Sequence, residues 1–228
     1  MLLYSIFSEN WVMLVASLIA YVSAILVAMS FHEFAHAYVA NKQGDPTAKA
    51  MKRLTLKPFT HVDIWGFVCL LLFGFGWAKP VPVDPRNFKH GRRSDFLVSI
   101  AGVTTNLIIS LVASLIYCLL YCIWPAFALG SNFYTIALEL FLNYSIFINL
   151  SLVFFNLIPI YPLDGYRIVE SIAGENNGFS SFMKRYGYIF MLVLYFTGLF
   201  SLYINVTAFN LGELFVKMWL KLFSLMGL

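Results

Sequence analysis

The chain has 228 residues, of which 61% are hydrophobic and only 11% are charged, against roughly 25% charged residues in a soluble globular domain. This composition excludes an ordinary soluble domain and predicts an all-α, multi-pass membrane protein. The net charge of +4 is not a nucleic-acid signal, because the basic residues fall in short loops between apolar stretches. We therefore expect the lipid bilayer, and no nucleic acid, as a partner.

About five apolar stretches are long enough to cross a bilayer as helices. The last one contains Glu213, Lys217 and Lys221, so it could instead lie along the interface as an amphipathic helix. We expect a single membrane-embedded domain over residues 1–228, with its core at about 11–175 and no soluble accessory domain. The predicted spans are 11–40, 96–124, 133–157, 186–206 and 211–228.

A sixth apolar segment, 64–78, is too short to cross comfortably. It contains Gly66, Gly74 and Gly76 and runs directly into a sequence with three prolines between positions 80 and 85. Prolines at that density cannot continue a helix. We interpret 64–83 as a re-entrant or membrane-embedded element rich in glycine and proline.

The basic residues predict the topology. Loops 41–61 and 79–95 each contain five Lys or Arg residues, and short positive loops stay in the cytoplasm. Both loops can be cytoplasmic only if 64–78 does not cross, which places the N-terminus outside. His61 and His90 fall in these loops, so we expect both to be solvated and to take no part in a metal site.

The first predicted span ends in His32-Glu33-Phe34-Ala35-His36, which fits the pattern His-Glu-x-x-His. Residues four apart share a helix face, so both imidazoles can bind one metal ion while the glutamate between them acts as general base. Residues 11–30 carry no charge, so these ionisable side chains lie at or within the bilayer, where such groups are costly and usually functional. The alternative is a chance match on an exposed helix end.

Two histidines do not complete a catalytic zinc site, which typically has three protein ligands and one open position. Asp164 is the best candidate for the third, because it follows the cytoplasmic end of the third span, on the side where the first span also ends. Glu139 has suitable chemistry, but it lies 17 residues before Asn156 on the same span, about 26 Å away along a helix. Glu170 is on the correct side without favourable spacing, and an Asp-Gly pair alone could be a turn or a helix N-cap.

These residues resemble the motifs of the site-2 protease family of intramembrane zinc metalloproteases. In that family, His-Glu-x-x-His on one transmembrane helix pairs with Asn-x-x-Pro-x-x-x-x-Asp-Gly on a later one, here from Asn156 to Gly165. The segments 76–83, Gly-Trp-Ala-Lys-Pro-Val-Pro-Val, and Ala101-Gly102-x-x-x-Asn106 are similar to compact prokaryotic members. The chain resembles the minimal form of the family, without PDZ or CBS domains.

The resemblance implies a zinc metalloendopeptidase that cuts transmembrane protein substrates in regulated intramembrane proteolysis. Its zinc would be held by His32, His36 and Asp164, with Glu33 as the catalytic base. The implied location is the prokaryotic cell membrane, with the active site near the cytoplasmic face. Neither the substrate nor the oligomeric state follows from the sequence.

Three further features have two interpretations each. Asn156 could bind the substrate backbone or the developing oxyanion, or it could make a structural hydrogen bond between broken helices. Asn106 could have either of the same two roles, and we favour the structural hydrogen bond. The segment 64–83 could dock an extended substrate by strand addition, or it could be a plug without substrate contact.

The main alternative function is a non-hydrolytic metal-binding or metal-transporting membrane protein, which also suits intramembrane histidines and carboxylates. Glu33 argues against it, since a transporter does not need a carboxylate between two ligands. A membrane zinc protease for prenylated proteins is less favoured, because its third ligand is a glutamate on a later helix.

Overall fold

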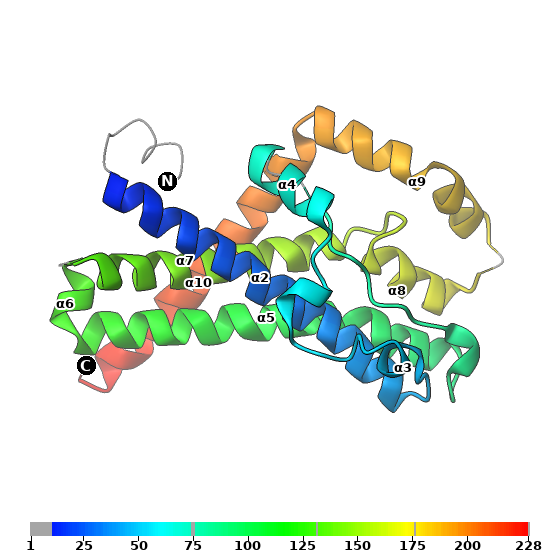
Figure 1. Cartoon of the computed structure of the whole chain (residues 1–228), viewed down its shortest axis with the longest axis horizontal. Coiled ribbons are helices and arrows are strands. Elements are labelled where there is room, and N and C mark those ends of the chain that lie inside the picture. Colours follow the sequence, from blue (N-terminus) through cyan, green and yellow to red (C-terminus); the bar gives the residue numbers. More distant parts are fainter. Residues whose placement is uncertain (1–10, 74–75, 131, 176, 228) are drawn as a thin grey trace. The chain divides into compact units, whose positions relative to one another are not determined.

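The computed structural model describes residues 11–73, 76–130, 132–175 and 177–227. Over these residues the secondary structure is helical apart from one isolated β-bridge (Figure 1). Two short 3-10 turns, η1 and η2, interrupt the loops of the first half. In chain order the elements are α2 (Trp11–Lys42), α3 (Thr47–Ala50), η1 (Pro58–Thr60), α4 (Ile64–Phe73), η2 (Pro85–Asn87), α5 (Arg92–Ile123), α6 (Pro125–Ala128), α7 (Phe133–Asn156), α8 (Asp164–Ala173), α9 (Gly178–Phe196) and α10 (Leu199–Leu225).

Four helices in the described part of the chain are long and apolar enough to cross a membrane: α2, α5, α7 and α10. The prediction of an all-α, multi-pass membrane protein is therefore confirmed. The first three spans lie where the sequence placed them, within a few residues at each end. The structure has four such helices among the described residues and not the expected five, because the helices of the C-terminal part begin and end at other residues than predicted.

The predicted break between the last two spans, at 207–210, is wrong. Helix α10 runs without interruption through these positions, and α9 ends earlier, at Phe196. The chain turns instead at Thr197 and Gly198, where Gly198 has a φ of 72°, the left-handed conformation that ends many helices. The predicted loop at 207–210 is therefore helical and lies inside α10. Helix α10 as a whole is long and apolar enough to cross a membrane.

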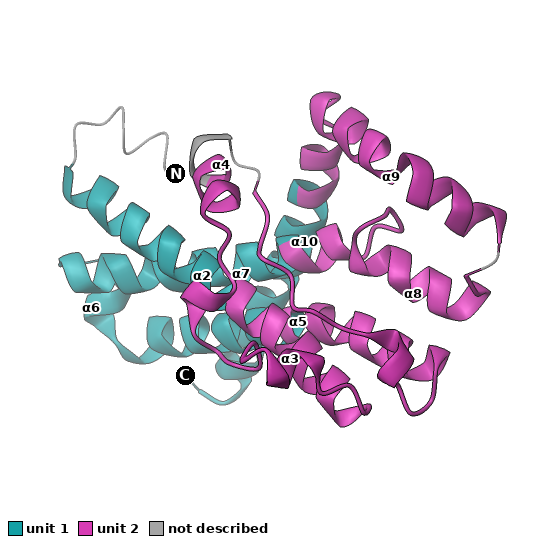
Figure 2. Ribbon diagram, turned by 45° about the vertical axis from the view of Figure 1, so that its right-hand side comes forward, with its two compact units in different colours: residues 1–28, 107–151, 205–228 teal, residues 29–106, 152–204 magenta. Residues whose placement is uncertain are grey.

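The chain forms two compact units (Figure 2). Unit 1 consists of Met1–Ala28, Leu107–Ser151 and Asn205–Leu228. Its core contains Ala16, Ala20 and Leu140, and small side chains such as the two alanines let membrane helices approach closely. Polar side chains link its helices as well, since the indole nitrogen Nε1 of Trp219 donates to Ser114 Oγ at 3.0 Å.

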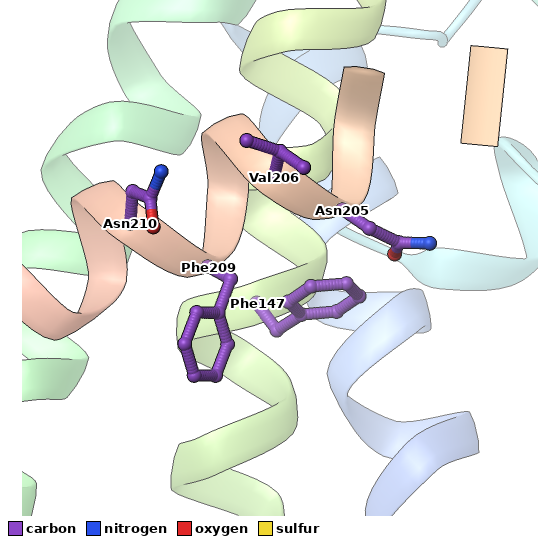
Figure 3. A pocket seen from close by; sticks show the side chains of 5 residues that line it. All are labelled: Phe147, Asn205, Val206, Phe209 and Asn210. Atoms are coloured by element: carbon purple, nitrogen blue, oxygen red, sulfur yellow. The ribbon is translucent and has the colours of Figure 1, made fainter. Parts of the chain in front are cut away.

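A groove of about 420 Å³ lies on unit 1 (Figure 3). Phenyl rings and two asparagine amides surround it, and none of its lining residues titrates or ligates metals well. It therefore offers no hydrolytic chemistry. The lining residues are Phe147, Asn205, Val206, Phe209 and Asn210.

Unit 2 consists of Met29–Asn106 and Leu152–Ile204. Its helix α4 has ten residues, or about 15 Å of helix, which is too short to cross a bilayer core of about 30 Å. Residues 74 and 75 of the predicted embedded element lie outside the described residues. After them Ala78 forms a bridge with Val62, and no described residue of the proline-rich sequence at 80–84 is helical, as expected.

One prediction about the loops is wrong. His61 is fully buried rather than solvated, and its Nε2 donates to the carbonyl of Thr55 at 2.7 Å. The loop between α3 and η1 folds around the ring and supplies this backbone acceptor, an arrangement that local sequence does not reveal. His90 is exposed, in agreement with the prediction.

Candidate active site

Helix α2 supplies the two histidines. His32 is buried and His36 is half-buried. Their Nε2 atoms lie 3.0 Å apart. The i, i+4 spacing therefore places both imidazoles on one face of the helix, as the sequence predicted.

Helix α8 supplies the carboxylate. Asp164 is its first residue, and Asp164 Oδ2 lies 3.2 Å from Nε2 of His32 and 3.2 Å from Nε2 of His36. Gly165 permits the sharp return of the chain into α8, because a Cβ there would collide with the carbonyl oxygens of Leu157 and Ile158. In the Asp-Gly pair, Gly165 therefore allows the backbone segments to approach closely, and Asp164 supplies the carboxylate beside the histidines.

Helix α5 fixes the orientation of both imidazoles. His36 Nδ1 lies 2.7 Å from the carbonyl oxygen of Val98, and His32 Nδ1 lies 3.1 Å from Asn106 Oδ1. Because these oxygens are acceptors, each Nδ1 carries a proton and donates it, which leaves the two Nε2 atoms beside Asp164 Oδ2 as the nitrogens available to a metal ion. Gly102 makes room for this arrangement, since a Cβ there would lie 2.5 Å from His32 Cε1 and His36 Nε2.

The three convergent atoms fit a metal ion. His32, His36 and Asp164 each offer one ligand atom, all within 4.8 Å of one another, and Asp164 Oδ2 is buried. Ligands about 2.0 Å from a tetrahedral zinc ion lie about 3.3 Å apart, close to the observed 3.0–3.2 Å. Burial by itself would raise the pKa of Asp164, but the neighbouring imidazoles outweigh it and hold that pKa well below its usual range. A charged carboxylate and two imidazoles are a common zinc ligand set.

Glu33 lies outside this cluster. Its Oε2 accepts a hydrogen bond of 2.8 Å from the backbone N–H of Val81, in the extended chain after α4. The carboxylate next to the first histidine is therefore engaged with the Gly/Pro-rich element and does not join the metal ligands. This contact links the two features that the sequence analysis singled out separately.

The other candidates are used elsewhere. Asn156 Nδ2 donates to the carbonyl of Leu152 in its own helix at 3.0 Å. Asn106 is fully buried beside His32, which favours the structural reading. Glu170 accepts from the Tyr166 hydroxyl and pairs with Lys184 at 2.7 Å.

Sequence reasoning missed the Val98 carbonyl, the Val81 amide and the steric role of Gly102. The first two are backbone groups, which leave no mark in a sequence. Gly102 was noted as part of a motif, and its spacing of four from Asn106 could have suggested that both face the histidines. Glu139 belongs to unit 1, whereas the ligand cluster belongs to unit 2.

Comparisons with known proteins point to one family of peptidases. Residues 20–200 match peptidase family M50. The chain is 41% identical over 208 residues to a Bacillus subtilis protein named "Putative zinc metalloprotease YwhC", covering 89% of this chain and 90% of the relative. It is 26% identical over 182 residues to "Putative zinc metalloprotease Rip2" of Mycobacterium tuberculosis, covering 75% and 64% of the two chains. No solved structure matched the chain.

Four apolar helices, together with two histidines and one aspartate that could hold a metal ion, are the features of a membrane metalloprotease. The chain belongs to peptidase family M50, the site-2 proteases, and is a zinc metalloprotease. The resemblance seen in its motifs is thereby confirmed.

Proposed function

We propose that this zinc metalloprotease hydrolyses peptide bonds in or near transmembrane segments of membrane-protein substrates, in regulated intramembrane proteolysis. The observation that carries the proposal is the position of His32 and His36, with Glu33 between them, on a helix long and apolar enough to cross a bilayer. A hydrolytic site built into such a helix suits a substrate that is itself in the membrane.

His32, His36 and Asp164 would hold the zinc ion, which when bound polarises the scissile carbonyl and makes the attacking water more acidic. Glu33 acts as general base, taking the proton from the attacking water and passing it to the leaving amine. Its position beside the ligand cluster, but not within it, supports this role.

The substrate must present an extended backbone, because the peptide bonds of a helix are protected by its own hydrogen bonds. The extended chain around Val81 lies at Glu33, so it is our candidate for docking the substrate by strand addition. Asn156 is the candidate to bind substrate backbone or the oxyanion, because its amide has a second N–H besides the one donated to the Leu152 carbonyl.

We place the active site near the cytoplasmic face of a prokaryotic cell membrane. The two basic loops are joined to each other, since Arg53 Nη2 donates to the Lys79 carbonyl at 2.7 Å and the Lys89 amide donates to Gln43 at 2.9 Å. Loops in direct contact share one side of the membrane, and short basic loops are typically cytoplasmic.

The experiment is co-expression of the protein with a panel of single-span membrane proteins from the same cell, comparing wild type with Glu33→Gln. The amide keeps the size of the side chain and still accepts from Val81, but it cannot take a proton from water. Loss of general-base catalysis costs about 10²–10⁴ in rate, so product should disappear while zinc content stays at wild-type level. Cleavage of a confirmed substrate by Glu33→Gln at near wild-type rate would contradict the mechanism. Zinc storage or transport by both forms without cleavage would favour the non-hydrolytic alternative.

A further inference from the structure

The extended segment 79–84, which we call the strap, is fixed at its N-terminal end by loop residues. The Lys79 amide donates to the carbonyl of His61 at 2.8 Å. Arg53 Nη2 donates to the carbonyls of Lys79 and Pro80, at 2.7 and 3.3 Å. These contacts are carried by the loop between α3 and α4.

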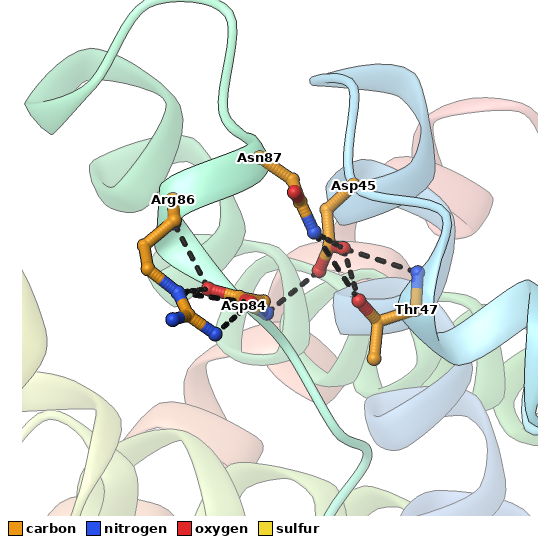
Figure 4. A network of polar contacts seen from close by, with 5 residues as sticks. All are labelled: Asp45, Thr47, Asp84, Arg86 and Asn87. Carbon is orange, nitrogen blue, oxygen red and sulfur yellow. Dashed lines mark hydrogen bonds and ion pairs between the residues drawn. The ribbon is translucent and has the colours of Figure 1, made fainter.

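The C-terminal end of the strap is fixed by one buried carboxylate. Asp45 has no exposed surface, and its Oδ2 accepts from the Asp84 amide at 2.8 Å. Its Oδ1 accepts from the Thr47 amide and hydroxyl and from Asn87 Nδ2, the latter at 2.9 Å. Figure 4 shows this carboxylate between the turn after α2 and the end of the strap.

Between these anchors, Val81 is the strap residue that reaches Glu33. Pro80 and Pro82 have no N–H, so the strap has few donors. Val81 and Asp84 are three residues apart, about 10 Å of nearly inextensible extended chain. Movement at Asp84 is therefore transmitted to the hydrogen bond at Glu33.

We propose that Asp45 is a positioning residue for the protease reaction, and that it acts through the strap. By holding the Asp84 amide, Asp45 keeps the Val81 N–H on Glu33 Oε2, which leaves Glu33 Oε1 directed for proton transfer from the attacking water. The inference rests on the proposed role of Glu33 as general base. It assigns a function to a carboxylate that lies outside the metal ligand set.

The donors around Asp45 are consistent with a charged, fixed anchor. Burial would raise the pKa of this carboxyl, but the hydrogen bonds from Thr47, Asp84 and Asn87 outweigh burial and keep the pKa below its usual range. To stabilise the turn alone, Asp45 would need only the contacts of its Oδ1. These contacts are with Thr47 in the turn and with the side chain of Asn87. The contact on Oδ2 is the one that joins the turn to the strap backbone.

Asp45→Asn separates these two sets of contacts. The remaining oxygen can keep the three donors on Oδ1, whereas the new NH₂ faces the Asp84 N–H, donor against donor. Thr47→Val is the matched control, since it removes one hydroxyl donor from Oδ1 and leaves the Asp84 contact. Arg86→Ala is a second control, because Arg86 binds the side chain of Asp84 and not Asp45.

The first measurement is backbone hydrogen exchange on the purified full chain, resolved at Val81 and Asp84. A hydrogen bond to a charged acceptor shifts an equilibrium by about tenfold or more. We therefore expect protection to fall at least about tenfold at both amides in Asp45→Asn, and to stay within about twofold of wild type in the two controls. Unchanged protection at Val81 in Asp45→Asn would overturn the coupling, whatever the protein cleaves.

The second measurement is kinetic, on a membrane substrate that wild type cleaves and Glu33→Gln does not. Asp45→Asn should lower kcat about tenfold, with KM within about twofold and zinc content unchanged. A rise in KM at constant kcat would overturn the positioning role and show that the strap only docks substrate. If wild type cleaves no substrate, the proposed function fails instead, and the exchange experiment still decides whether Asp45 controls Val81.

Discussion

At the scale of single residues, the candidate metal site consists of three ligand atoms that lie close together, one each from His32, His36 and Asp164. Each histidine donates Nδ1–H to an acceptor on α5, so each Nε2 is free to ligate, and Asp164 Oδ2 completes the set. Partners of this kind fix the tautomer and orientation of a ligand and raise its affinity for metal. The sequence could predict from spacing and topology that these three side chains come together, but it could not predict the contact with the Val98 carbonyl.

Asn106→Ala tests this arrangement. Without Oδ1, the His32 ring loses the acceptor that fixes its tautomer, and zinc should bind about 10–100-fold more weakly. The dissociation constant can be measured by competition with a chromophoric chelator. Asn149→Ala is the control, because Asn149 is also fully buried but donates to Ser145 in its own helix. Equal zinc affinity in Asn106→Ala and wild type would mean that His32 does not depend on this partner.

At the scale of elements, the sequence predicted helices well where apolar length decides the structure. Helices α2, α5 and α7 lie at the predicted places. The division of the C-terminal part failed, because Asn210 and its neighbours were read as a connection while Gly198 forms the turn. Extended chain after α4 could be predicted from its prolines, whereas its contact with Glu33 is tertiary and has no sequence signature.

Gly165→Ala tests how the start of α8 places Asp164. The added Cβ would overlap the backbone carbonyls of Leu157 and Ile158, so the loop before α8 must open and carry the adjacent carboxylate away. Zinc affinity should fall by about 10–100-fold, measured as metal per chain after dialysis against a chelator. Gly178→Ala at the start of α9 is the control, since a Cβ there meets open space. Full zinc retention in Gly165→Ala would show that the loop absorbs the methyl group without moving Asp164.

At the scale of the whole molecule, composition alone established the class, since so apolar a chain can only be stable in a bilayer. The positions of the positive charges then predicted the topology, because short basic loops are not translocated. The structure adds a physical link, in that hydrogen bonds join the two basic loops directly. Helix α4 between them has ten residues, about 15 Å, which is shorter than a bilayer core of about 30 Å.

Cysteine labelling tests this topology from outside intact cells. In a background without Cys69, Cys118 and Cys122, single cysteines replacing Lys49 and Lys89 should both resist an impermeant maleimide until the membrane is opened. A cysteine replacing Leu129, which is 80% exposed after α5, should react at once. The 32 residues of α5 are about 48 Å long, so we expect its two ends on opposite sides of the bilayer.

The comparison of positions 49 and 89 is the decisive part of this experiment, because both flank α4 and neither depends on where α9 and α10 run. Equal protection means that the chain enters and leaves the α4 region on the same side, as the bonds between the loops require. Labelling of one position without the other would show that α4 crosses the membrane. The strap would then be separated from Asp45 and Glu33, and the docking and positioning roles proposed for it would both be excluded.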